Sequence, residues 1–184
     1  MPSMEITRPT LIVVSGPPGS GKTTLARRLA RRIGCPAICR DEIKEGMVLA
    51  SPAFQASATD ELNLRTLPTF FGVLRLLLEA GVTTVAEAAF QDRVWRPRLE
   101  PLTELADVRV VQCVVDERVA HERIRLRETS EPTRRAHDED QAHRLLGPGF
   151  ARLALEVPSI DVDTTDGYMP GIAEVARFAV VRTP

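Results

Sequence analysis

The chain has 184 residues, of which 43% are hydrophobic and 27% are charged, and its formal net charge is −1. This composition excludes a disordered or membrane-spanning class, and the near-neutral charge gives no overall electrostatic reason to bind nucleic acid or an anionic membrane. The length predicts a single α/β domain over residues 1–184. The N-terminus has no apolar signal-like stretch and the three cysteines lack zinc-type spacing, so we expect a cytoplasmic protein with reduced thiols.

The first part of the chain predicts two strand–helix pairs. Residues 10–15 form a β-branched run that stops at a Gly/Pro-rich segment, and the helical pattern of residues 23–33 follows at once. A short strand is expected at 36–40 and a second helix at 41–50. Asp41 is the expected N-cap of that helix.

The middle of the chain continues the alternation. Apolar residues with helical spacing between 67 and 78 predict a helix that ends at Gly81, where a helix-terminating glycine belongs. Residues 82–90 are a third strand, and residues 96–106 are helical with Pro97 at the first position and Pro101 as a bend. The apolar run at 108–115 is typical of a strand buried on both faces.

The last third of the sequence completes the predicted fold. Asp116 caps a helix over 116–128, and the polar stretch that follows predicts a mobile lid over about 123–149. Residues 158–168 give a fifth strand, and a final helix occupies 171–181. Strands alternating with helices predict a parallel sheet covered by helices on both faces, a three-layer α/β sandwich.

A phosphate-binding motif lies between the first predicted strand and helix. Gly16, Gly21, Lys22 and Thr23 satisfy GxxxxGK[ST], and glycines let the backbone turn its N–H groups toward a β-phosphate. The Lys22 charge would span the β- and γ-phosphates as a catalytic group, and the Thr23 hydroxyl would coordinate Mg²⁺. A plain Gly/Pro turn would leave the Lys-Thr pair unexplained. The predicted ATP-binding residues here are Gly16, Pro17, Pro18, Gly19, Ser20, Gly21, Lys22, Thr23 and Thr24.

Two carboxylates follow neighbouring predicted strands. Asp41 is most simply a helix cap, yet at a strand tip beside the phosphate loop it can also accept the proton of an attacking hydroxyl. Glu87 ends the third strand, from where it can reach the metal, a metal-bound water or the acceptor. The alternative for Glu87 is a salt bridge or simple exposure to solvent.

A pair of arginines lies at the start of the predicted lid. Arg123 and Arg127 are four residues apart, so both guanidinium groups can point the same way. One can stack on a base, and the other can meet the γ-phosphate as charge develops. Because Arg118 and Arg125 crowd the same helix, a solvated basic face is the alternative.

Four segments in this order, GPPGSGKTT, CRDEIKEG, TVAEAAF and ERIRLR, resemble the AAA_33-type P-loop kinases. These are similar in layout to polynucleotide 5′-hydroxyl kinases, chloramphenicol phosphotransferase and zeta toxins. The resemblance covers nearly the whole chain. It implies a five-stranded sheet in the order 2-3-1-4-5 and transfer of the γ-phosphoryl group of ATP, with Mg²⁺, to a hydroxyl.

The resemblance also implies roles for single residues. Asp41 matches the aspartate that deprotonates the acceptor, and Lys44 matches a basic residue on the acceptor side. Glu87 falls where such kinases hold the acceptor or the metal. Arg123 and Arg127 match the lid pair, with Arg127 as the catalytic member. The segment DTTDGY implies that Thr165 to Tyr168 pass near the adenine, with Thr165 and Gly167 as predicted ATP-binding residues.

The acceptor side departs from the nucleic-acid kinases. Lys44 stands where they tend to use Arg, and Glu87 stands where they tend to use Asp. The segment DEIKEGM carries three acids against one lysine, which disfavours a polyanion. We therefore expect a small-molecule hydroxyl acceptor, such as a sugar, nucleoside or antibiotic. A polynucleotide 5′-hydroxyl kinase and a nucleotide-hydrolysing ATPase module remain as alternatives.

Overall fold

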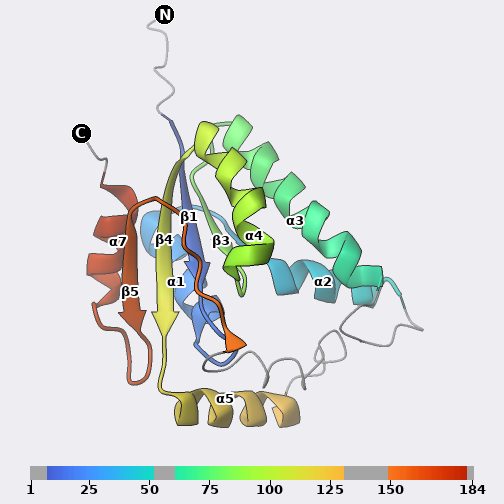
Figure 1. Ribbon diagram of the computed structural model, residues 1–184, viewed down its shortest axis with the longest axis vertical. Helices are drawn as coiled ribbons and strands as arrows, with labels where there is room; N and C mark the ends of the chain where they lie inside the picture. The colour runs from blue at the N-terminus through green and yellow to red at the C-terminus, as the bar shows by residue number, and fades with distance from the viewer. Residues whose placement is uncertain (1–7, 52–60, 131–148, 182–184) are drawn as a thin grey trace, which may run out of the picture.

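The structure is a computed structural model that describes residues 8–51, 61–130 and 149–181. Within these residues, five parallel strands form one sheet in the order β2-β3-β1-β4-β5 (Figure 1). The strands are β1 (Thr10–Ser15), β2 (Ala37–Cys39), β3 (Thr84–Glu87), β4 (Asp107–Val114) and β5 (Ser159–Asp163). The predicted strand order and three-layer architecture are confirmed.

The central strands are buried because helices cover both faces of the sheet. On one face, α1 (Lys22–Ile33) and α7 (Ile172–Val180) pack on Ile12, Val14 and Val111. On the other face, α3 (Glu61–Glu79) and α4 (Asp92–Leu99) pack on Leu11, Val13 and Val110. The β-branched run of β1 thus alternates its side chains between two cores, as a parallel strand requires.

Two further helices lie where the strands end. The helix α2 (Arg40–Leu49) follows β2 directly and packs against α3. The helix α5 (Glu117–Ser130) crosses beyond the carboxyl ends of the strands, at the bottom of Figure 1. This edge of the sheet therefore combines strand ends, helix starts and the segment between β1 and α1.

Two capping predictions had different outcomes. Asp116 does cap α5, because its Oδ1 accepts hydrogen bonds from the N–H groups of Arg118 (3.0 Å) and Val119 (3.2 Å). Asp41 is not an N-cap: α2 begins one residue earlier, at Arg40, Cys39 occupies the cap position, and no side chain bonds the helix start. Asp41 instead lies in the first turn, where a carboxylate complements the helix dipole.

The prolines near residue 100 also differ in part from expectation. The predicted bend at Pro101 is confirmed, because α4 gives way to the 3₁₀ turn η1 (Glu100–Glu104). Pro97 was expected at the first helical position, but α4 begins at Asp92 and Pro97 lies inside it. Of the predicted lid, residues 131–148 lie outside the described part of the chain. Among the described helices, none combines the length and apolarity needed to cross a membrane.

Candidate functional site

The phosphate loop, residues 16–21, runs between β1 and α1 in a conformation that depends on glycine. Gly19 and Gly21 both have φ near +73°, a region that residues with a Cβ rarely adopt. A Cβ on Gly19 would lie 2.5 Å from the carbonyl oxygen of Ala120 in α5, and one on Gly16 would lie 2.9 Å from Cβ of Cys113. The loop therefore passes α5 and β4 too closely for larger residues.

The start of α1 is arranged to receive an anion. The first turn of α1 contains no acidic residue, and no side chain caps it. Lys22 begins the helix, is 9% exposed, and places its Nζ 3.5 Å from the carbonyl oxygen of Pro17. Pro17 and Pro18 have no N–H, and the N–H of Ser20 donates to the carbonyl oxygen of Pro17 at 3.2 Å, so Gly19 and residues 21–23 supply the backbone donors for an anion. These donors, the helix dipole and the Lys22 ammonium favour a bound phosphate.

Thr23 and Glu87 meet beside this loop. The Thr23 hydroxyl lies 3.2 Å from Oε2 of Glu87 and donates to it. Glu87 is 1% exposed, and its Oε1 has no hydrogen-bond partner among the described residues. Burial raises the pKa of Glu87 to about 7; the positive charge of Lys22 opposes this rise and the negative charge of Asp41 adds to it. The site thus buries a carboxyl group of which one oxygen has no hydrogen-bond partner among the described residues.

These oxygens fit a magnesium ion. Mg²⁺ prefers hard oxygen ligands and commonly binds through one or two protein groups together with substrate phosphates and water. The Thr23 hydroxyl and the unpartnered oxygen of Glu87 offer such ligands next to the phosphate loop. In residues 8–51, 61–130 and 149–181, no cluster of three or more His, Cys, Asp or Glu could hold a metal. With Thr23 and Glu87 as protein ligands, a magnesium ion here would take phosphate oxygens and water as its other ligands.

Asp41 lies at the same sheet edge and forms an ion pair with the preceding residue, Arg40. Its side chain is 49% exposed, and its Oδ1 lies 2.9 Å from Nη1 of Arg40. Nη2 of Arg40 donates to Oδ1 of Asn63 in α3 at 2.6 Å, so one guanidinium links the Asp41 carboxylate to the next helix. No local pattern indicates this role of Arg40, because its second partner lies 23 positions away.

Lys44 is placed differently from the other predicted acceptor residues. It is a buried residue of α2, only 2% exposed, whereas Asp41 in the first turn of the same helix is half exposed. The structure brings Lys22, Thr23, Asp41 and Glu87 to one edge of the sheet. Lys44 is buried in the second turn of α2, the helix that carries Asp41.

A cavity of about 390 Å³ opens beside the phosphate loop. Among the residues predicted to bind ATP, it is lined by Gly21, Thr24, Arg123, Arg127 and Gly167. The cavity is also lined by Tyr168, which ends the range expected near the adenine, and by Arg28 and Thr164, which were not predicted. Arg28 follows Thr24 by one helical turn, a spacing that could have indicated it, and its guanidinium lies 5.6 Å from the ring centre of Tyr168.

Arg123 links three segments around this cavity through hydrogen bonds to backbone carbonyl groups. Its Nη2 donates to the carbonyl oxygens of Thr164 (2.8 Å) and Thr165 (3.1 Å), and its Nη1 lies 3.4 Å from the carbonyl oxygen of Gly19. The Thr164 hydroxyl donates to the Ser20 carbonyl oxygen at 2.6 Å. A solvated basic face is therefore the wrong description for Arg123, which joins α5, the phosphate loop and the end of β5.

Thr165, which was predicted to lie near the adenine, is not among the residues that line the cavity. Its hydroxyl accepts a hydrogen bond of 3.0 Å from the backbone N–H of Asp116. It thus connects the segment after β5 to the start of α5.

Comparisons with known proteins agree with this architecture. The sequence matches the family model AAA_33, described as an AAA domain, over residues 11–146. No curated protein matches it. The chain is similar to a protein of Chloroflexus aurantiacus j-10-fl, with a TM-score of 0.80 and 22% identity over 94% of this chain and 97% of that chain. It is also similar to a sugar kinase from Janibacter sp. HTCC2649, with a TM-score of 0.65 and 20% identity over 95% of both chains. Chaetomium thermophilum Kti12 in complex with ADP-AlF3 has a TM-score of 0.67 and 15% identity over 94% of this chain and 100% of that chain. At these identities the likeness shows a shared fold.

Proposed function

Because the chain belongs to the AAA_33 family, we propose that it is an ATP-dependent kinase that transfers the γ-phosphoryl group of ATP to a hydroxyl group of a small molecule. One observation carries this proposal: carboxylates and a phosphate loop share one sheet edge. Lys22 and Thr23 lie on the loop side, and the buried Glu87 and half-exposed Asp41 follow the two neighbouring strands. A module that only binds nucleotide has no use for the Asp41 carboxylate held beside the phosphates.

The nucleotide would bind across the loop and the cavity beside it. The backbone N–H groups of Gly19 and of residues 21–23 would hold the phosphates, and the cavity lined by Arg123, Arg127 and Gly167 would receive the base and ribose. Kti12, whose similarity covers 94% of this chain, forms a complex with ADP-AlF3, and this supports nucleotide binding by the shared fold. Mg²⁺ held by Thr23 and Glu87 would neutralise phosphate charge.

The chemical step follows from the placement of charges. Asp41 accepts the proton of the acceptor hydroxyl, and the hydroxyl oxygen forms a bond to the γ-phosphorus while the bond from that phosphorus to the β–γ bridging oxygen breaks. ADP leaves with the bridging oxygen. Lys22 stabilises the charge that develops on the phosphoryl oxygens, and Arg127 lies one helical turn from Arg123 to do the same.

A small acceptor is supported by the surface beside Asp41. The first two turns of α2 carry Asp41, Glu42 and Glu45, whereas the lysine of that helix is buried. A polynucleotide needs several exposed cations to replace its counterions, and this surface presents carboxylates. The sugar kinase that shares this fold over 95% of both chains is also consistent with a small hydroxyl acceptor.

The test is ADP release from ATP and Mg²⁺ with a panel of hydroxyl acceptors that includes sugars, nucleosides, antibiotics and a 5′-hydroxyl oligonucleotide. We expect acceptor-dependent ADP release, with the phosphorylated acceptor identified by mass spectrometry. Lys22→Ala should remove most of it, and Asp41→Asn should lower kcat with ATP affinity nearly unchanged. Equal ADP release with and without every acceptor would indicate an ATPase, and transfer to the oligonucleotide alone would indicate a polynucleotide kinase.

A further inference from the structure

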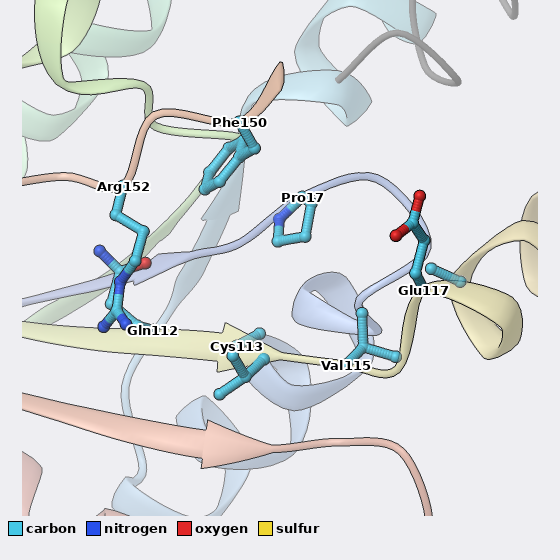
Figure 2. Close-up of a pocket in the computed structure, with 9 residues that line it drawn as sticks. Pro17, Gln112, Cys113, Val115, Glu117, Phe150 and Arg152 are labelled. Carbon is cyan, nitrogen blue, oxygen red and sulfur yellow. The ribbon is translucent and has the colours of Figure 1, made fainter. Parts of the chain in front are cut away.

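A second cavity, of about 310 Å³, meets the phosphate loop at Pro17 (Figure 2). Cys113 contributes to it from the end of β4, Val115 from the segment that follows this strand, Ala120 from α5, and Phe150 from the segment that precedes β5. The nucleotide cavity meets the loop elsewhere, at Gly21, and none of the residues described as lining one cavity also lines the other. The loop therefore has a separate space near its first residues.

This cavity lies next to the group that holds the phosphates. The carbonyl oxygen of Pro17, one of its lining residues, is 3.5 Å from Nζ of Lys22. The Lys22 charge also reaches Cys113, where it opposes the rise in pKa that burial causes. A molecule in the cavity would thus lie beside the ammonium that contacts the β- and γ-phosphates.

The walls of the cavity are apolar. Figure 2 shows the rings of Pro17 and Phe150 on one side, and on the other Cys113 of β4 and Val115 of the segment that follows this strand. This arrangement suits a flat, uncharged body, because ring surfaces are buried well between other rings and aliphatic groups.

The polar side chains at the rim already have partners. Nε2 of Gln112 donates to the carbonyl oxygen of Leu153 at 3.3 Å, and Arg152 pairs with Asp161. Glu117, on the first turn of α5, adds a negative charge that is mostly exposed. Among the described lining residues, the only cation is therefore neutralised, and the cavity does not favour an anionic occupant.

We propose that this cavity binds an aromatic or similar ring group of the phosphoryl acceptor, so that the substrate class is a hydroxyl compound with an apolar ring substituent. This inference rests on the proposed kinase function. A cavity of about 150 Å³ lined by apolar groups is large enough for benzene, so 310 Å³ admits a substituted ring or two fused rings. The hydroxyl would extend past Pro17 toward Lys22, and the ring would remain behind the loop.

The test compares pairs of compounds that share a hydroxyl-bearing part and differ in one aryl group. Suitable pairs are methyl and phenyl β-D-glucopyranoside, and glycerol and 3-phenoxypropane-1,2-diol. Binding to the full chain is measured by calorimetry and ligand-observed NMR, so no turnover is needed. We expect the aryl member of each pair to bind about tenfold tighter or more, from burial of the ring. Equal affinity within both pairs would overturn the proposal.

Substitutions of the lining residue Phe150 test whether the aryl group binds in this cavity. Phe150→Ala should abolish the preference for the aryl member, Phe150→Tyr should keep it, and Leu76→Ala, which truncates an exposed apolar side chain on α3, should leave it unchanged. Retained ADP binding shows that each variant is folded. A preference that survives Phe150→Ala would place the ring elsewhere and contradict the proposal.

A last variant separates this inference from the kinase proposal. Lys22→Ala should lose phosphoryl transfer yet keep the aryl preference in binding, because Lys22 is not among the described residues that line the cavity. Aryl preference without any transfer in the wild-type chain would retain the cavity and remove the kinase function. Phosphoryl transfer by the wild-type chain without a preference for aryl compounds would retain the kinase function and contradict the proposed role of the cavity.

Discussion

The Thr23 hydroxyl donates a hydrogen bond of 3.2 Å to Oε2 of Glu87, which joins the start of α1 to the end of β3. The two residues are 64 positions apart and meet because β3 pairs with β1, where Glu87 lies opposite Val14. The bond places a buried carboxylate against the helix start that would receive phosphate. Removing this hydrogen bond, or protonating Glu87, should therefore affect both the free energy of unfolding and nucleotide binding.

The first prediction concerns the pH dependence of stability without nucleotide or metal. Burial raises the pKa of Glu87 from 4.5 to about 7, so between these values the folded chain retains a proton that the unfolded chain has lost. The free energy of unfolding should then decrease as pH rises from 4.5 to about 7, by about 3 kcal/mol in all, and this contribution should be constant above that range. Urea unfolding in the presence of a chelator at several pH values measures it.

Glu87→Gln is the matched variant for this prediction. Glutamine keeps an oxygen that can accept the Thr23 hydrogen bond but does not titrate. Its unfolding free energy should lack the decrease between pH 4.5 and 7. The same decrease in wild type and variant would show that another group causes it.

The second prediction compares two glycines with similar backbone conformations. Gly19 and Gly34 have φ of +73° and +87°, but a Cβ would meet the Ala120 carbonyl at Gly19 and no atom within 4 Å at Gly34. Gly34→Ala should cost about 1–2 kcal/mol of stability from the left-handed conformation alone and leave ADP binding intact. Gly19→Ala should cost more and lower ADP affinity at least tenfold, since the loop must move away from α5. Equal effects on ADP affinity would contradict this account.

The third prediction separates two arginines of α5. Arg123 donates to backbone carbonyls of the phosphate loop and of the end of β5, whereas Arg125 is exposed. Arg123→Ala should raise the KM for ATP about tenfold or more and lower the melting temperature, because it leaves three carbonyls without their donor. Arg125→Ala should change neither by more than about twofold or one degree. Similar values for both variants would assign Arg123 to the solvated face.

The fourth prediction concerns Arg40 as a positioning residue. Arg40→Ala should lower kcat about tenfold or more and leave the KM for ATP unchanged, because the Asp41 carboxylate loses its ion pair with Arg40 and with it its position near the acceptor. Arg40→Lys should restore part of the rate. The control is Arg27→Ala, which removes an exposed ion pair between α1 and Glu42, a residue of α2 like Arg40. An unchanged kcat in Arg40→Ala would reduce Arg40 to a structural link with Asn63.

Local patterns in the sequence determined much of the fold. The strand at 10–15, the glycine-rich loop and the helix after it follow from side-chain preferences and backbone freedom within a few residues, and all three lie where predicted. The cap at Asp116 is also local, because its carboxylate bonds N–H groups two and three residues on. The strand order came from the resemblance, since pairing between strands leaves no local trace in one sequence.

Other features could be decided only by the tertiary structure. The expected cap at Asp41 was wrong because the helix begins at Arg40, whose guanidinium finds its second partner in α3. Thr164 reaches Ser20 across 144 positions, and Arg123 reaches Gly19 across 104. The cavity between Pro17 and Phe150 likewise exists only after distant segments pack together. Sequence patterns report the preferences of neighbouring residues, whereas these contacts depend on where the sheet places residues that are far apart along the chain.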